Sequence, residues 1–534
     1  MSSSRIFRSG CAALVPILLV ALTLGFTWPI GTAAAQTELK VAVSTFTGEK
    51  VDPINGGFGM HVYTAPIYDY LVTMSRDRKP SPGIAESWSV SAGAKSYTFN
   101  IRRGMKWHNG DDVTAEDVAN HFKRLEKGTG AFGGVFKKNI ASTEVVDSHT
   151  IIVHLKNPWP DFIDFLGPGD TSVAAITPKK YIDEVGEEGF RKNPVGSGPW
   201  KLIERKTGSY FLYEAVSDHP YRPKPGFDRM RIMLVPEEST RIAMLKRGEA
   251  HLADIGFDSA KEIEASGNQV LEIPNSVLVF ISFIGTWEER AKTLNVPTQW
   301  DNKDVRKALA MAIDREELLE FMALGKGRLA SGFPAFPDGL GWDADWDRDN
   351  QTPYDPAMAK KLLADSGYPD GFKLRFYTLP ISGAQWLPKM AQIVSDYWKK
   401  VGIDVELIST EWGAFGPIVY SRPDADLGAV YTFRTTQSSF PIGRMTNYVS
   451  GRGKAVVANV PWDDDHAMVA QETDMAKREQ MFKDLMHRLK DTYTLIPIMY
   501  VNALFGASKG VTNWVPYNGW PSPGLSYEYF KPAG

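Results

Sequence analysis

The chain is nearly free of cysteine. Its 534 residues contain one, Cys11, which lies in an apolar stretch at the N-terminus. If that stretch is removed on export, the remaining chain has no thiol, which excludes disulfides, cysteine-ligated metals and cysteine nucleophiles. Stability must then come from buried apolar cores, and 43% hydrophobic residues are enough to build them. At this length two or more lobes are expected.

Long hydrophobic runs are also missing after residue 35. No later run approaches the ~20 apolar residues that a membrane span requires. The N-terminal run, residues 11–26, follows two arginines and leads into Ala33-Ala34-Ala35. This order predicts a cleaved signal peptide over residues 1–35, with a retained membrane anchor as the competing interpretation. The cysteine stands at the start of the run instead of after it, so we expect a soluble periplasmic protein without a lipid anchor.

Neither sign of charge predominates. Lysine and arginine total 60 against 63 aspartate and glutamate residues, which leaves a net charge of −3. No dense basic cluster occurs, and this argues against nucleic acid or an anionic membrane surface as a partner. Tandem repeats and low-complexity linkers are absent as well, so short crossings must join the lobes.

The motifs of common enzymes and metal sites are absent too. The sequence has no G-x-S-x-G elbow, no P-loop and no H-E-x-x-H helix. Its nine histidines are scattered, and we expect the two most conspicuous, His108 and His466, in solvated turns. Gly196 and Gly198 are not followed by the Lys-Ser/Thr of a phosphate loop, so they predict a tight turn. We therefore expect no metal, no cofactor and no catalysis.

What is present is a strong α/β pattern. Alternating apolar residues predict a hairpin around Trp88–Val90 and Tyr97–Ile101. Thr114, three residues before Asp117, predicts a capped helix behind it. Elsewhere the pattern predicts a first strand over residues 39–43, a helix over 60–71 and a buried strand over 277–284. It also predicts a crossover with parallel pairing, formed by a strand over 372–376, a helix over 386–401 and a strand over 403–407.

Aromatic residues are conspicuous. The chain has 15 tryptophans, many of them in predicted loops. Packing explains most single tryptophans, but a ligand cleft also uses aromatic walls with a few polar groups. A secreted carbohydrate-active enzyme with a tryptophan-rich cleft is the alternative, and it would need two carboxylates flanking one site.

Five stretches carry a family resemblance. They are AESW, SYTFNIRRGMKWHNG, VTAEDV, PVGSGPWKL and NKDVRKALAMAIDREELL. Together they closely resemble the solute-binding proteins of peptide, nickel and opine ABC importers, family 5, which include dipeptide- and oligopeptide-binding proteins. The resemblance implies a monomeric α/β protein of the two-lobed periplasmic-binding-protein fold, type II, with an extra small domain. Its partners would be a small-molecule solute, an inner-membrane permease and the ATPase of that permease. A role as a chemoreceptor or chaperone-like partner is a third possibility.

The resemblance also implies domain bounds. Lobe I would combine residues 36–79, 175–275 and 506–534. The extra domain would be 80–174, and lobe II would be 276–505. The solute would bind in the cleft between the lobes, and the crossings near 275 and 505 would form the hinge.

The family pattern implies two groups of ligand-binding residues. Asn55, Phe58 and His61 belong to a loop, NGGFGMH, that lines the ligand in relatives. The second group consists of Trp412, Tyr431, Thr432, Phe433, Arg434 and Thr435. Thr435 aligns with an aspartate that holds the α-amino group of peptides in relatives, and Arg434 adds a positive charge beside it. An anionic, neutral or hydroxyl-rich solute, such as an opine or an oligosaccharide, therefore fits better than an ordinary peptide. The competing interpretation is that Arg434 pairs with an acid elsewhere in the protein.

Overall fold

The computed structural model describes residues 36–128, 133–168, 172–337, 339–381, 383–421, 423–437, 441–451, 456–512, 514, 516–517 and 520–533. The predicted signal peptide, with Cys11, lies outside the described residues. The chain divides into two units, residues 1–36 and 37–534, and the fold below is that of the second unit.

One large mixed sheet organises this unit. Its strands are β1 Glu38–Val43, β8 Trp200–Lys206, β9 Tyr210–Ala215, β10 Arg229–Leu234, β11 Leu252–Asp254, β12 Gln269–Phe283, β13 Gly327–Leu329, β14 Lys373–Thr378, β15 Asp404–Ser409, β16 Ala429–Thr436 and β17 Leu495–Ala507. They follow the order β15-β14-β16-β12-β17-β11-β1-β10-β9-β8, and β13 also pairs with β17. The predicted parallel crossover is confirmed, because β14 and β15 pair in parallel and the helix over residues 387–400 connects them.

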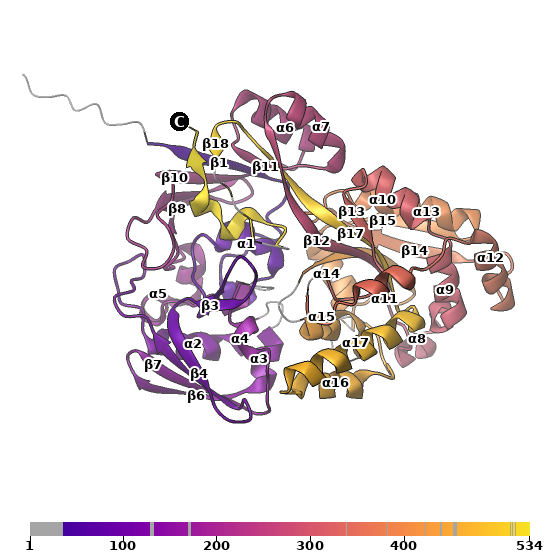
Figure 1. Ribbon diagram of the computed structural model, residues 1–534, viewed down its shortest axis with the longest axis horizontal. Coiled ribbons are helices and arrows are strands. Elements are labelled where there is room, and N and C mark those ends of the chain that lie inside the picture. The colour runs from indigo at the N-terminus through magenta and orange to yellow at the C-terminus, as the bar shows by residue number, and fades with distance from the viewer. Residues whose placement is uncertain are drawn as a thin grey trace, which may run out of the picture. The chain divides into compact units, whose positions relative to one another are not determined.

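The two longest strands join the halves of this sheet. In Figure 1, β12 and β17 run side by side across the centre of the unit. They pair antiparallel, and their register shifts between Ile273 and Val277. Within that interruption Asn275 has a left-handed φ of 44°. Asn275 N donates to Asn502 Oδ1 at 3.0 Å, and Ser276 Oγ accepts from Ala503 N at 3.1 Å. Side chains therefore replace ladder hydrogen bonds at the interruption.

A separate four-stranded antiparallel sheet contains the predicted hairpin. It consists of β4 Ala85–Val90, β5 Ser96–Ile101, β6 Ile140–Asp147 and β7 Thr150–Leu155, in the order β4-β5-β7-β6. Helix α2, Ala115–Leu125, packs against β6 and β7. Its N-terminus has the predicted capping box between Thr114 and Asp117. Hairpin and capped helix are thus confirmed.

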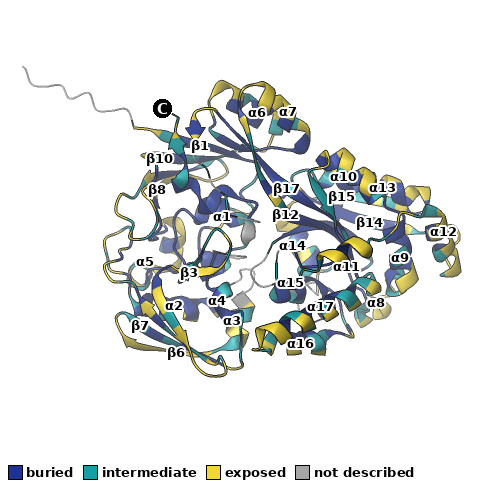
Figure 2. Cartoon of the chain, in the orientation of Figure 1, coloured by how far each residue is buried: buried dark blue, intermediate teal, exposed yellow. Residues whose placement is uncertain are grey.

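Helices surround the sheets, and Figure 2 shows yellow, exposed residues on α12 and α16, whereas the strands β12, β14 and β17 are mostly dark blue. The remaining α-helices are α1 His61–Thr64, α3 Gly133–Asn139, α4 Phe162–Phe165, α5 Lys179–Lys192, α6 Glu238–Arg247, α7 Ala260–Ala265, α8 Glu289–Thr293, α9 Lys303–Met311, α10 Arg315–Ala323, α11 Ala344–Asp349, α12 Pro356–Asp365, α13 Leu387–Lys400, α14 Trp412–Tyr420, α15 Pro441–Val449, α16 Asp463–Gln471 and α17 Met475–Thr492.

Short elements complete the fold. Two small antiparallel pairs are formed by β2 Val72–Met74 with β3 Pro80–Pro82, and by β18 Val511–Thr512 with β19 Lys531–Pro532. The 3-10 turns are η1 Pro53–Asn55, η2 Phe58–Met60, η3 Ser172–Ala174, η4 Phe257–Ser259, η5 Gln299–Asp301, η6 Pro523–Leu525 and η7 Tyr527–Tyr529.

The helix predicted over residues 60–71 is wrong. Only α1 forms there, and the chain then continues in turns. Pro66 has no N–H, and the carbonyls of Pro66 and Ile67 accept hydrogen bonds from Trp200 and Gly198. Every residue of the segment is buried, so neighbouring segments satisfy its backbone on all sides.

The predicted turn into a strand is confirmed, since a bend at Gly198 leads into β8, and Gly196 also makes a close backbone contact. A Cβ at Gly196 would lie 2.0 Å from the carbonyl oxygen of Ile67. We expect Gly196→Ala to lower the free energy of unfolding by at least about 2 kcal/mol, because backbone cannot move aside as a flexible side chain does. Urea denaturation of the full chain measures this. Gly134→Ala is the control, since a Cβ there meets nothing within 4 Å. Alanine in helix α3 should raise the free energy of unfolding slightly. Equal effects of the two substitutions would contradict the contact.

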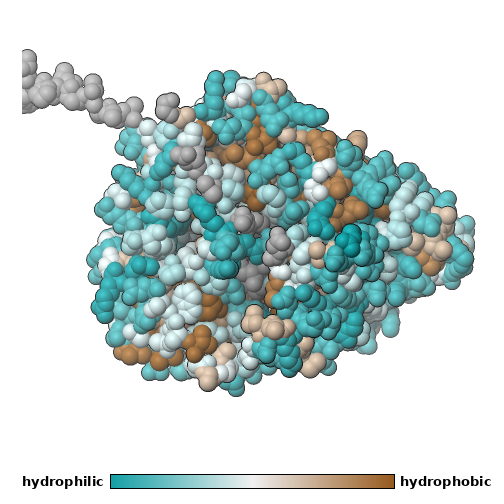
Figure 3. Space-filling view, in the orientation of Figure 1, coloured by the Kyte–Doolittle hydropathy of each residue, from teal (hydrophilic) through white to brown (hydrophobic). Residues whose placement is uncertain are grey.

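The surface is mostly polar on the face shown in Figure 3, where hydrophobic residues come to the surface in scattered groups. Among the residues described, no helix is long and apolar enough to cross a membrane.

Candidate functional site

An aromatic cluster surrounds the middle of β16. Phe433 stacks on Phe415 of α14, with ring centroids 5.7 Å apart and planes 12° apart. Trp412 lies 5.8 Å from Phe433, and Tyr431 lies 5.6 Å from Phe415. The rings of Phe280 and Tyr448 close the cluster from β12 and α15. Residues 431 and 433 share one face of the strand because side chains alternate along it.

Trp412 is the part of this cluster that reaches the surface. It is the first residue of α14, three positions after β15 ends, and 38% of its side chain is exposed. Tyr431 and Phe433 are buried, and burial raises the pKa of the Tyr431 phenol. Trp412 is therefore the aromatic residue of this cluster that is most accessible from outside.

Two buried arginines lie near the end of β16, close to Tyr448 of the cluster; Arg434 belongs to the strand and Arg444 to α15. Arg434 and Arg444 are each 5% exposed. Arg444 donates from Nη2 to Thr436 Oγ1 at 3.3 Å, which brings α15 to the strand two residues beyond Arg434. Burial lowers the pKa of Arg434 to about 10, while the nearby phenol of Tyr448 works in the opposite direction. Burial lowers the pKa of Arg444 in the same way, so both guanidinium groups are held where water is scarce.

The threonines of β16 have different surroundings. Thr432 is fully buried, and its hydroxyl lies 3.5 Å from the carbonyl oxygen of Phe280. Thr435 is also buried, yet its Oγ1 has no hydrogen-bond partner among the residues described. A buried hydroxyl without a partner is costly, so Thr435 is the better candidate to meet a ligand.

The loop with Asn55, Phe58 and His61 belongs to the other half of the sheet, near β1. Asn55 ends η1, Phe58 begins η2, and His61 begins α1. His61 is fully buried, with its ring 5.1 Å from that of Trp520 and 6.3 Å from that of Tyr70. These contacts are those of a packing residue. The side chain of Phe58 is outside the described part of the structure.

A buried ion cluster holds this loop in place. Arg124 of α2 donates from Nη2 to Asp52 Oδ2 at 2.8 Å and from Nε to Glu187 Oε1 at 2.9 Å. Asp52 in turn accepts from Ile54 N at the start of η1. Burial raises the pKa of the Asp52 carboxyl, and Arg124 acts against that rise. The loop is therefore anchored by one arginine to α2 and α5.

A second buried ion pair joins two distant parts of the chain. Arg478 of α17 donates from Nη2 to Asp161 Oδ2 at 2.5 Å and from Nε to the carbonyl oxygen of Val469 at 3.1 Å. Asp161 directly precedes α4. Burial and the neighbouring Asp161 raise the pKa of Asp164 to about 7. Residues 80–174 and α17 thus meet at a site with two carboxylates and a buried cation.

The sequence did not reveal these anchoring residues. Arg124, Asp161 and Arg478 have no local motif, and only Asp52, next to Pro53, carried a cap signal. The expectation of solvated turns is wrong for His466, which is buried in α16, and only partly right for His108, which lies in a turn but is half-buried. His108 Nε2 lies 2.9 Å from the Gly198 carbonyl, and burial lowers its pKa to about 4. His466 is buried against Thr446.

Metal-ligand groups do not occur in the described ranges, since no three His, Cys, Asp or Glu side chains come together there. The candidate site therefore offers cations, hydroxyls and aromatic surface. Such a set can bind a solute, and it contains no nucleophile paired with a base.

The chain matches a known protein family over most of its length. Residues 79–454 match the bacterial extracellular solute-binding proteins, family 5 Middle. The chain is 30% identical over 388 residues to heme-binding protein A of Haemophilus influenzae, and the match covers 67% of each chain. It is 27% identical over 537 residues to the glutathione-binding protein GsiB of Escherichia coli O1:K1 / APEC, covering 96% of this chain and 97% of that protein.

The fold matches a solved structure of the same kind. This is the ABC transporter-associated periplasmic binding protein DppA from Helicobacter pylori in complex with peptide STSA, with a TM-score of 0.80 and 21% identity. The match covers 93% of this chain and 99% of that one. The predicted α/β periplasmic-binding-protein fold is confirmed. The chain belongs to the family 5 extracellular solute-binding proteins, and it is the non-enzymatic, substrate-binding component of an ABC importer.

Proposed function

We propose that this protein captures an anionic or hydroxyl-rich small solute in the periplasm and delivers it to an inner-membrane permease and its ATPase. Capture occurs by closure of two lobes. Lobe I comprises residues 36–79, 175–275 and 506–534, and lobe II comprises 276–505. The small domain, 80–174, extends lobe I.

The interruption in β12 supports a hinge near residue 275. Regular ladder bonds are lost there, and Asn275 and Ser276 hold the strands by side-chain bonds to Asn502 and Ala503. Hinges are short segments that absorb a change in backbone angles, and a register shift with a left-handed residue is such a segment. Since β12 and β17 are paired at this point and both connect the two lobes, the lobes would rotate about this pair of strands.

The ion pair between Asp161 and Arg478 supports closure onto the small domain. It joins residues that are 317 positions apart, one in the proposed extension of lobe I and one in lobe II. Both side chains are buried at this contact. A solute that binds between the lobes shifts the population toward this arrangement if it makes contacts that the open form lacks.

The single observation that carries the solute class is the pair of buried arginines beside the aromatic cluster. Arg434 and Arg444 bear positive charge with little access to water. A carboxylate of the solute would add charge-assisted hydrogen bonds to the contacts that these arginines already make. Trp412 and the hydroxyl of Thr435 would add an apolar surface and a polar contact. Asn55 and Phe58 remain the proposed contributors from lobe I, and the predicted ligand residue His61 instead supports their loop by packing against Trp520 and Tyr70.

Arg434→Met is expected to weaken solute binding at least tenfold, because it removes a buried cation and replaces it with an uncharged side chain that is also long. Native mass spectrometry of the full chain identifies a co-purified solute, and glutathione is the first probe because a relative covering nearly the whole chain is named for it. Calorimetry then compares Arg434→Met with Arg348→Met, whose arginine is exposed and pairs with Asp345 and Asp349. Equal affinities in both variants would assign Arg434 to structure. Chemical conversion of the bound solute would contradict a binding role.

A further inference from the structure

A cavity of about 310 Å³ lies outside the proposed cleft residues. Its walls come from the β2–β3 hairpin and its flanks, from Arg102, from Tyr221 and Arg222, and from the C-terminal segment around Tyr529. None of the residues lining it belongs to the range 269–507, which contains β12, β16 and β17. The cavity is therefore built by residues of the proposed lobe I and its extension alone, and β16 takes no part in it.

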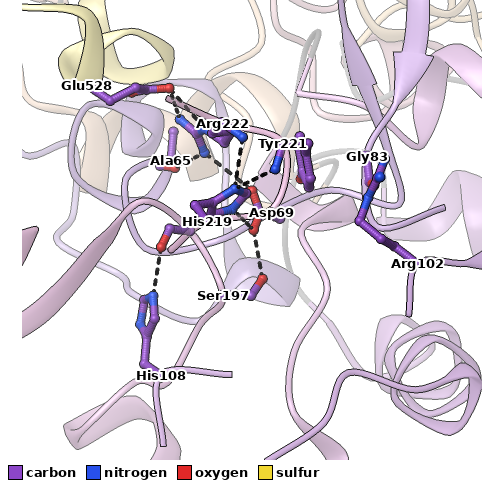
Figure 4. A network of polar contacts seen from close by, with 11 residues as sticks. Ala65, Asp69, Gly83, Arg102, His108, Ser197, His219, Tyr221, Arg222 and Glu528 are labelled. Carbon is purple, nitrogen blue, oxygen red and sulfur yellow. Dashed lines mark hydrogen bonds and ion pairs between the residues drawn. The ribbon is translucent and has the colours of Figure 1, made fainter. Parts of the chain in front are cut away.

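The charges on its walls are unequal. Arg76, Arg102 and Arg222 line the cavity against one carboxylate, Asp69. That carboxylate is already engaged, because Asp69 Oδ2 lies 2.9 Å from His219 Nε2 and accepts from Ser197 Oγ at 2.9 Å. Figure 4 shows Asp69, His219 and Arg222 in one cluster beside Glu528. The carboxylate of Asp69 is thus engaged within the cluster, while Arg76 and Arg102 also line the cavity.

The three arginines differ in how they are held. Arg222 donates from Nε and Nη2 to Glu528 Oε1 at 2.9 and 2.8 Å, so its charge is balanced. Arg102 donates from Nε to the carbonyl oxygen of Gly83 at 3.3 Å and lies 5.1 Å from the ring of Tyr221. Its Nη groups make no hydrogen bond within the described residues. Arg76 lies 4.4 Å from the ring of Tyr529.

Aromatic rings and a carbonyl fix a guanidinium in position without neutralising it. The plane of Arg102 is thereby oriented while its two Nη groups remain available to a planar oxyanion, which arginine binds bidentately. At roughly 30 Å³ for each water-sized group, a cavity of this volume holds about ten non-hydrogen atoms. This size suits a small carboxylate or phosphate and is too small for an oligopeptide.

We propose that this cavity is a second binding site, for a small oxyanion such as a dicarboxylate or inorganic phosphate, with Arg102 as its principal ligand. The site is separate from the solute cleft and does not depend on the identity of the transported solute. An anion bound there would connect the β2–β3 hairpin, through Arg76, and the end of β5, through Arg102, with the C-terminal segment.

Calorimetric titration of the full chain with sodium malate, and separately with sodium phosphate, tests the proposal. We expect one saturable site for at least one of the two, and the comparison tells a carboxylate site from a phosphate site. Arg102→Met should weaken that binding at least tenfold. Arg103→Met is the matched control, since Arg103 is the exposed neighbour and does not line the cavity. Arg434→Met should leave this site unchanged, which separates it from the solute cleft.

Three results would overturn the proposal. They are the absence of saturable binding by either anion, equal weakening in Arg102→Met and Arg103→Met, and loss of the site in Arg434→Met alone. Circular dichroism and the melting temperature of each variant verify its folding. If Arg102→Met unfolds, Arg102→Lys replaces it. Because lysine keeps the charge but cannot bind bidentately, we then expect binding that is weaker but still saturable, and unchanged affinity would count against Arg102 as the ligand.

Discussion

Arg478→Met is expected to weaken solute binding at least tenfold although Arg478 lies far along the chain from β16. The arginine is buried, and it pairs with Asp161, which directly precedes α4 in the proposed small domain. Removing one partner of a buried pair costs about 3–5 kcal/mol, because the other charge stays buried without compensation. If this contact belongs to the closed form alone, the cost falls on closure, and the open form gains population.

The effect of this substitution should depend on pH. Asp164 binds its proton below about pH 7, since burial and Asp161 raise its pKa to about 7. A carboxyl whose pKa is raised in the folded state favours that state at low pH, and the advantage is lost as the pH rises through the raised pKa. Arg478 lowers the pKa of Asp164, so its loss leaves the Asp164 carboxylate less compensated at pH 8, whereas Asp164 is neutral at pH 5.5. The loss of affinity should therefore be larger at pH 8.

Calorimetry at both pH values and small-angle scattering with and without solute measure these effects. Arg488→Met is the matched control, because Arg488 lies on the same helix and its pair with Asp465 is exposed. Adding Asp161→Asn to Arg478→Met should restore much of the affinity, since the carboxylate that lost its partner is then removed. If the two arginine variants behave alike, the buried pair has no role in closure.

Arg124→Met is expected to lower the free energy of unfolding by about 3–5 kcal/mol, because it leaves the buried carboxylate of Asp52 without its cation. The same change releases the Asn55–His61 loop from α2 and α5, so solute affinity should fall as well. The pKa of Asp52 is already raised by burial, and losing Arg124 raises it further. The deficit in stability should then be smaller at pH 5 than at pH 8.

Urea denaturation at the two pH values measures this result. Arg191→Met is a close control, since Arg191 lies 4.0 Å from both Asp52 and Glu187 but is half-exposed. It should change the free energy of unfolding by less than about 1 kcal/mol. A similar loss in both variants would mean that general electrostatics, and not the buried hydrogen bonds of Arg124, hold the loop.

Local patterns in the sequence predicted the regular elements well. The hairpin β4–β5, the capping box of α2 and the parallel crossover of β14 and β15 all follow from periodicity and cap residues within a few positions of one another. The helix predicted after Met60 failed, although Pro66 was visible in the sequence. The reason is that this segment is buried on every side, so apolar residues there mark a core crossing and do not form one helical face.

The candidate site was predictable only in part. The structure brings Trp412, Tyr431 and Phe433 together, which the family motifs implied but local patterns did not. Thr432 and His61 are fully buried, and no local pattern distinguishes a strand residue that packs from one that meets a solute. The sequence did not predict Arg444 as a site residue. It lies near Arg434 because α15 packs against the end of β16.

By itself the sequence determined the family, the α/β class and most strands and helices, since each depends on neighbours a few residues apart. Only the tertiary structure decided which charges are buried together. Arg478 and Asp161 are 317 positions apart, and Arg124 and Asp52 are 72 apart. Such pairs arise when folding removes water from groups that no local rule relates. The cavity around Arg102 has the same origin, because its walls meet only after the C-terminal segment packs beside the β2–β3 hairpin.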